Sequence, residues 1–209
     1  MAMMDAHVSF LLQAALISLS GVMAPGPITA ATLAAGMRSR HAGGLIAVGH
    51  GLVEFPLMVL VMAGMGTLLA SKVVTVGIGL VGGFFLMVMG WDILRGLAKP
   101  FDAAKASSAK SPIWTGIVLT GGNPYFLLWW VTIGLTLTSR ALQLGVVAFG
   151  LFAVIHWLCD FVWLEVLSFA SFKGTTLVGD RVHKVVLGVC SVALVCLGLF
   201  FVVDAFLKL

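Results

Sequence analysis

Long apolar stretches separated by short polar connectors make up most of this sequence. Each stretch could cross the ~30 Å hydrocarbon core of a bilayer as a helix, which needs about 20 residues. Because lipid offers the backbone no hydrogen-bond partners, such a segment must be helical. The pattern therefore predicts an all-α polytopic membrane protein with six transmembrane helices. The apolar stretches cover residues 8–35, 43–70, 74–95, 113–138, 142–171 and 184–207.

Composition narrows the class of protein further. Hydrophobic residues make up 61% of the chain and charged residues only 10%, whereas a soluble domain carries about 25% charged residues. The connectors are too short for a soluble catalytic domain, and no nucleophile–base set, phosphate-binding loop or cofactor motif is evident, so we expect no enzyme activity and no cofactor. The 12 Lys and Arg residues are scattered and form no patch for nucleic acid.

The distribution of Lys and Arg predicts the topology. The first, third and fifth connectors hold nine of these residues and the opposite side holds three. The positive-inside rule then places the odd connectors in the cytoplasm and both termini outside a plasma or inner membrane. The longest connector, residues 99–112, is a cytoplasmic linker between a first three-helix repeat, residues 1–98, and a second, residues 113–209. With three helices in each half, the second repeat must be inverted.

Matching residues in the two halves support such a repeat. The breaker Pro25 in the first stretch corresponds to Pro124 in the fourth at an offset of 99 residues. Four matches in serial order are typical of inverted-topology transporters. Three further pairs share an offset of 106 residues: His50 with His156, Glu54 with Asp160, and Gly82 with Gly188.

The first and fourth stretches contain helix breakers at corresponding depths. Pro25-Gly26-Pro27 interrupts the first, and Asn123-Pro124 interrupts the fourth. Proline lacks the N–H that continues a helix, so both helices should be broken. The half-helix after each break would turn its N–H groups and positive dipole end toward a cavity, where a substrate carboxylate could bind. The alternative is a pair of structural kinks.

Four ionisable residues lie halfway along the second and fifth stretches. His50 and Glu54, like His156 and Asp160, are one helical turn apart and share a helix face. Charge at this depth is costly and marks functional sites. We expect the four side chains to meet and to exchange protons. They could instead be neutral hydrogen-bonded pairs, or ligands of a divalent metal ion.

Three other features accompany these residues. Glu165 lies off the Asp160 face, so it could pair within the bundle or reach the outer half of the cavity. A binding pocket could be lined by Trp129-Trp130 and by Trp157 and Trp163, which lie around Asp160. The GxxxG pattern from Gly79 to Gly83 predicts close helix packing, either within the chain or in a homodimer.

These motifs together resemble a known family. The chain resembles the lysine-exporter (LysE/RhtB) translocators in two places. Their first two helices resemble three short runs of this sequence, Gly21-Val22-Met23-Ala24-Pro25-Gly26-Pro27, Gly36-Met37-Arg38 and Gly49-His50-Gly51. Their second signature resembles Asn123-Pro124. The resemblance implies a secondary active transporter that exports amino acids or related small metabolites in exchange for protons. The signatures map substrate binding onto Pro25, Gly26, Pro27, Asn123 and Pro124. The wider superfamily includes metal-ion exporters, which keeps the metal-ligand alternative open.

Overall fold

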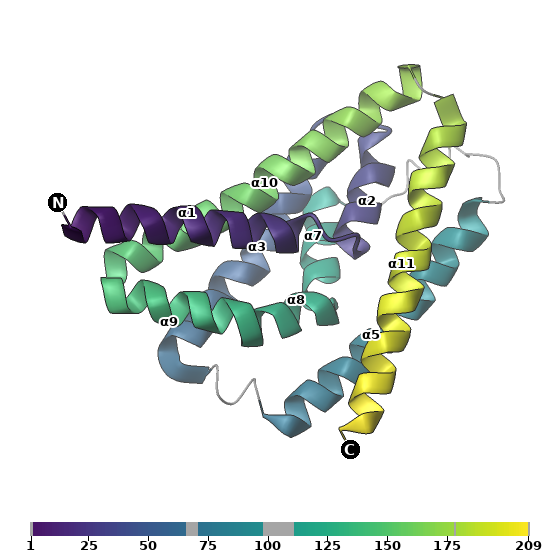
Figure 1. Ribbon diagram of the computed structural model, residues 1–209. Helices are drawn as coiled ribbons and strands as arrows, with labels where there is room; N and C mark the ends of the chain where they lie inside the picture. Colours follow the sequence, from purple (N-terminus) through teal and green to yellow (C-terminus); the bar gives the residue numbers. More distant parts are fainter. Residues whose placement is uncertain (1, 66–70, 98–110, 178, 209) are drawn as a thin grey trace.

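The computed structural model is all-helical throughout the residues that it describes, 2–65, 71–97, 111–177 and 179–208 (Figure 1). This confirms the predicted all-α class, whereas the arrangement as six spans in two inverted repeats stays a prediction. Five helices, α1, α3, α5, α10 and α11, are long and apolar enough to cross a membrane. In chain order the elements are α1 (Ala2–Val22), α2 (Pro27–Gly36), α3 (Ala42–Leu60), the π-helical turn η1 (Val61–Met65), α5 (Lys72–Leu97), α7 (Pro112–Gly121), α8 (Pro124–Trp129), the π-helical turn η2 (Trp130–Gly134), α9 (Leu135–Leu144), α10 (Val146–Leu177) and α11 (Gly179–Leu207).

Both predicted helix breaks are present. The first apolar stretch is divided into α1, which ends at Val22, and α2, which begins at Pro27. The fourth is divided into α7, which ends at Gly121, and α8, which begins at Pro124. Proline stands at the first position of both new helices, where its missing N–H costs nothing. In Figure 1, α1 and α2 run in clearly different directions, as do α7 and α8.

The remaining helices surround these breaks in contacting pairs. Helix α5 lies along α11, and α3 packs against both α7 and α10 (Figure 1). The GxxxG face is used within the chain, because a Cβ on Gly83 would lie 2.7 Å from the Gly198 carbonyl oxygen of α11. Large apolar side chains such as Val73 and Val81 of α5 are exposed, as expected for helices that face lipid.

One predicted boundary is wrong. The sequence placed a polar connector between residues 138 and 142, whereas α9 continues to Leu144 and the chain turns at Gly145, whose φ is +112°. The helix continues because Leu137 and Ala141 are buried in the core. Between them, the Arg140 guanidinium lies 5.9 Å from the Phe10 ring centroid, where a cation is favourable.

The linker prediction falls largely outside the described residues. Of residues 99–112, the structure describes Ser111 and Pro112, the latter at the start of α7. Lys99, Lys105 and Lys110, which supported the predicted topology, lie outside the described part. The predicted second stretch, 43–70, corresponds to α3 and η1 up to residue 65, and its last five residues also lie outside.

Candidate functional site

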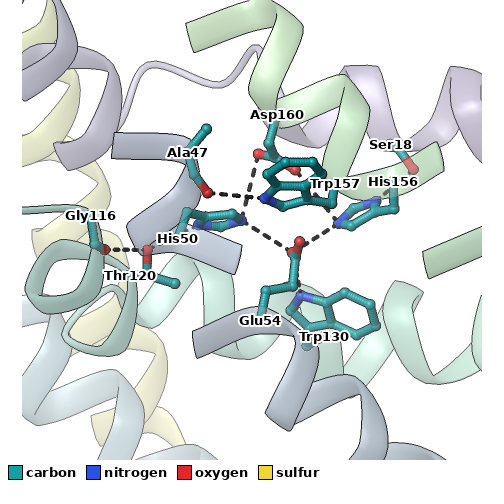
Figure 2. Close-up of polar contacts among 10 residues, drawn as sticks. All are labelled: Ser18, Ala47, His50, Glu54, Gly116, Thr120, Trp130, His156, Trp157 and Asp160. Carbon is teal, nitrogen blue, oxygen red and sulfur yellow. Dashed lines mark hydrogen bonds and ion pairs between the residues drawn. The ribbon is translucent and has the colours of Figure 1, made fainter. Parts of the chain in front are cut away.

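The four predicted ionisable residues converge at one buried point between α3 and α10 (Figure 2). Helix α3 contributes His50 and Glu54, and α10 contributes His156 and Asp160. Oε1 of Glu54 lies 3.1 Å from Nε2 of His50 and 3.1 Å from Nε2 of His156. Glu54 is fully buried, and the other three residues are at most 8% exposed. The i, i+4 spacing of each pair makes this meeting possible because it places both members on one helix face.

Close backbone contacts bring the supporting helices together. A Cβ on Gly43 of α3 would lie 1.9 Å from the Leu164 carbonyl oxygen of α10. On another side of α3, a Cβ on Gly49 would lie 2.0 Å from the Ile113 carbonyl oxygen of α7. Only glycine allows backbones to approach this closely. The two contacts hold α3 against α10 and α7 in the two turns that precede His50.

Two carboxylate oxygens of the cluster have no hydrogen-bond partner. They are Oε2 of Glu54 and Oδ2 of Asp160, and both are buried. Trp130 donates its indole N–H to Oε1 of Glu54 at 3.3 Å. The Asp160 oxygens lie farther out, 3.6 Å from Nε2 of His50 and 3.9 Å from Nε2 of His156. Because a buried unpaired acceptor is costly, the cluster is suited to holding a proton or a cation.

The other ring nitrogen of each histidine contacts a hydroxyl from a different helix. Nδ1 of His50 lies 2.9 Å from Oγ1 of Thr120 in α7, and Nδ1 of His156 lies 2.7 Å from Oγ of Ser18 in α1. Sequence reasoning did not select these two hydroxyls. The available signal was positional: each lies shortly before a helix break, and they are separated by 102 residues, close to the other repeat offsets.

A cavity of about 80 Å³ lies between the cluster and the two breaks, with room for a small polar molecule or a few waters. Of the predicted substrate residues, Gly26 and Asn123 line it. Pro25, Pro27 and Pro124 are not among its lining residues, and Pro27 and Pro124 are fully buried. The cavity is lined by Ser18, Gly21, Val22, Ala24, Gly26, Ile28, Thr29, His50, Glu54, Asn123, Tyr125, Phe126, Trp129, Trp130, His156, Asp160 and Leu164.

Aromatic rings form one wall of this cavity. Trp129 stacks on the His156 ring, with centroids 5.0 Å apart, and the Phe126 and His50 rings meet at 75° with centroids 5.2 Å apart. Trp129 and Trp130 line the cavity, as the sequence predicted, whereas Trp157 and Trp163 are not among its lining residues. Trp157 has another role, since its indole N–H donates to the Ala47 carbonyl oxygen at 3.0 Å.

The two breaks differ in how their new helices begin. At the first, Gly26 has extended backbone geometry and supplies no side-chain cap to α2. At the second, Oδ1 of Asn123 accepts a hydrogen bond from the Tyr125 N–H at 3.1 Å. One of the first donors of α8 is therefore already satisfied by the chain itself.

Glu165 lies away from the cluster, as its sequence position predicted. One of its oxygens accepts a hydrogen bond from the Gly44 N–H at 2.8 Å, and the other pairs with Nδ1 of His41. The Glu165 carboxylate, which α10 carries, thus accepts a hydrogen bond from one of the unpaired N–H groups at the N-terminal end of α3. Glu165 therefore joins the N-terminal end of α3 to the middle of α10.

Comparison with known protein families identifies the class of protein. A sequence model of the LysE type translocators matches residues 19–205, nearly the whole chain. The chain belongs to the LysE type translocator family. A search of curated proteins and of solved structures gave no match. Membership of a translocator family, together with the five long apolar helices, identifies a multi-pass membrane transporter that acts on a small-molecule substrate.

A metal ion is a second ligand that this donor set could hold. One ligand atom each from His50, Glu54 and Asp160 lies within 4.8 Å of the others. Imidazole nitrogen and carboxylate oxygen suit zinc and similar divalent ions. The same distances also suit hydrogen bonds, because Nε2 and Oε1 are 3.1 Å apart.

Proposed function

We propose that this translocator is a secondary active transporter that exports amino acids or related small metabolites by proton antiport. The observation that carries the proposal is the buried cluster of two carboxylates and two imidazoles beside a cavity lined by both helix breaks. Intramembrane charges with this environment mark proton relays and substrate pathways in transporters. The family supplies the transport function, and the cluster supplies a place for the coupling proton.

In this proposal His50, Glu54, His156 and Asp160 carry the proton. Glu54 is the central group, because its Oε1 is within hydrogen-bond distance of both histidines. The two unpartnered carboxylate oxygens favour an added proton, which would give a buried carboxylate a donor of its own.

The substrate would bind in the adjoining cavity, between the breaks Pro25-Gly26-Pro27 and Asn123-Pro124. Gly26 and Asn123 face the cavity, while the prolines end the preceding helices and set where α2 and α8 begin. A substrate carboxylate would sit at a helix N-terminus, where N–H donors and the dipole favour negative charge. The aromatic wall of Phe126, Trp129 and Trp130 would cover the apolar part of the substrate.

We further propose that residues 1–98 and 113–209 form two inverted three-helix repeats in the plasma or inner membrane, joined by a cytoplasmic linker at 99–112, with both termini outside. Exchanged contacts support the repeat. His50 of the first half contacts Thr120 of the second, and His156 of the second contacts Ser18 of the first. The helices that follow the breaks are exchanged in the same way, because α2 packs on α11 and α8 packs on α5.

Export of a divalent metal ion is the second candidate, and the spacing of His50, Glu54 and Asp160 favours it. In that case the four groups would ligate the transported ion, and proton movement would be secondary. The two candidates differ in what stabilises the purified protein, since a ligand that binds only the folded state raises its thermal stability by mass action.

The test combines binding and transport. Purified protein is screened by thermal shift against amino acids and divalent metal ions, and the amino acids that stabilise it are followed in proteoliposomes with an imposed pH gradient. We expect stabilisation by amino acids and counterflow of protons during their transport. A stoichiometric bound metal whose removal by a chelator abolishes transport would overturn proton antiport in favour of the metal candidate.

A further inference from the structure

We propose that Ser18 and Thr120 are positioning residues that fix the tautomers of the two buried histidines, so that both Nε2 atoms face Glu54. Each hydroxyl lies on the helix that precedes a break and contacts the histidine of the opposite half (Figure 2). The proposal rests on the proposed function only in taking the cluster as the coupling site.

The direction of each hydrogen bond follows from a second contact of each hydroxyl. Oγ1 of Thr120 donates to the Gly116 carbonyl oxygen at 2.6 Å, and Oγ of Ser18 donates to the Ala14 carbonyl oxygen at 2.7 Å. A carbonyl oxygen cannot donate, and a hydroxyl has one hydrogen. With that hydrogen given to the carbonyl, the hydroxyl offers only lone pairs to the imidazole. Nδ1 of His50 and Nδ1 of His156 must therefore carry the hydrogen.

This assignment decides what the other nitrogen can do. With Nδ1 protonated, Nε2 is a lone-pair acceptor in the neutral ring and a donor in the imidazolium. Both Nε2 atoms lie 3.1 Å from the same Glu54 oxygen. Two lone pairs beside a carboxylate oxygen repel it, so the arrangement is stable only when a proton or a cation is shared among the three atoms. The exchangeable position of both rings is thereby directed at Glu54 rather than at the helix backbone.

The hydroxyls also connect this position to the helix breaks. Ser18 lies in the last part of α1, and Thr120 lies next to the end of α7. Ser18 lines the cavity together with Gly21, Val22 and Gly26 around the first break. A substrate that shifts the end of α1 or α7 would lengthen the hydrogen bond between the hydroxyl on that helix and Nδ1 of its histidine. The histidine would then no longer be held in one tautomer. Substrate occupancy and the proton site are then linked through two hydroxyls.

The tautomers can be measured directly in the intact protein. The chain contains five histidines, so ¹⁵N-histidine labelling of the full-length protein in lipid nanodiscs gives few signals. His50→Gln and His156→Gln assign the two buried rings. In the wild type we expect hydrogen on Nδ1 of both. Thr120→Val, which keeps the shape and removes the hydroxyl, should change the tautomer of His50 alone, and Ser18→Ala should change that of His156 alone.

Matched variants separate positioning from general damage. Thr120→Ser should restore the wild-type tautomer. Thr75 of α5 also donates to the carbonyl four residues earlier, at Ser71, and Thr75→Val should leave both buried histidines unchanged. Proton-coupled transport should fall about 10-fold in Thr120→Val, the size expected when a buried imidazole N–H loses its hydrogen-bond acceptor, and recover in Thr120→Ser.

Three results would overturn the proposal: hydrogen absent from Nδ1 in the wild type, tautomers that do not respond to loss of the hydroxyls, or altered tautomers with undiminished transport. Because the tautomer measurement needs no substrate, it still decides whether the hydroxyls position the rings if the wild type transports no amino acid. Failure of the wild type to transport any amino acid would count against the proposed function alone.

Discussion

The two halves of the chain contribute matching residues to the cluster, but the matches are not equivalent. Glu54 and Asp160 occupy corresponding positions, one turn after a histidine. Glu54 lies 3.1 Å from both imidazoles and its side chain is 1% exposed, whereas Asp160 lies at 3.6 and 3.9 Å and its side chain is 11% exposed. Glutamate has one methylene more than aspartate, which lets Glu54 reach both rings. The first half thus supplies the centre of the site.

The two helix breaks also differ, in how the helix that follows each break is capped and packed. The α2 N-terminus, after Gly26, has no side-chain cap, whereas the α8 N-terminus is capped by Asn123. The second break is also held from outside, because a Cβ on Gly82 of α5 would lie 2.5 Å from the Pro124 ring. Gly188, the match of Gly82, has Leu97 as its nearest such neighbour, at 3.5 Å. The first break thus leaves the start of α2 without a side-chain cap, whereas the second break is capped and packed against α5.

The largest expected difference is between the two carboxylates. Glu54→Gln preserves size but leaves no carboxylate between the imidazoles. Because a carboxamide cannot take up and release the coupling proton, proton-coupled transport should fall about 100-fold or more. Asp160→Asn, with its longer distances, should reduce it about 10-fold. Uptake into proteoliposomes under a fixed pH gradient measures both. Equal losses in the two variants would show that the centre is shared and not held by Glu54.

The next difference concerns stability at the two matched glycines. Gly82→Ala places a methyl group against the rigid Pro124 ring and should destabilise the protein by about 1–3 kcal/mol. Gly188→Ala makes only an ordinary van der Waals contact and gains up to about 1 kcal/mol of helix propensity, so its thermal stability should be unchanged or higher. Thermal unfolding in detergent distinguishes them. A stable Gly82→Ala protein would mean that the second break is not fixed by α5.

The sequence predicted the parts of this site that depend on local pattern. Charges inside apolar stretches selected the four ionisable residues, and proline and glycine located both breaks. It could not predict which carboxylate is central, because that depends on side-chain reach across a helix contact. Ser18 and Thr120 also escaped prediction, since hydroxyls that bond to their own helix backbone are ordinary in apolar helices. The contact between Thr120 and His50 is evident only from the structure, in which α3 and α7 approach closely at Gly49.

The boundary of α9 shows a similar limit. Arg140 looks like a connector residue by charge, yet it lies within α9, where Leu137 and Ala141 are buried and the guanidinium lies over the Phe10 ring. The aromatic partner comes from α1, more than a hundred residues away in the chain. Tertiary contact therefore overrides the local polar signal, and no reading of the connector alone could supply that contact.

The smallest expected effect tests the two caps by exchanging them. Gly26→Asn would give α2 the cap that α8 has. Position 26 accepts a side chain because its backbone is extended and a Cβ there would lie 3.8 Å from its nearest neighbour, the Ala24 carbonyl oxygen. An Asn cap occupies donors that a substrate carboxylate would otherwise use, a contribution of about 1 kcal/mol, or roughly 5-fold in affinity. The loss should appear for a substrate with a free carboxylate and not for its amide, since the amide gains little from the helix N-terminus.

Asn123→Gly, which uncaps α8, is the matched variant and should leave this discrimination between carboxylate and amide unchanged or slightly increase it. Binding of one amino acid and its amide to the three proteins gives the comparison. Equal weakening for both ligands in Gly26→Asn would place the carboxylate elsewhere and remove the functional distinction between the uncapped and the capped break.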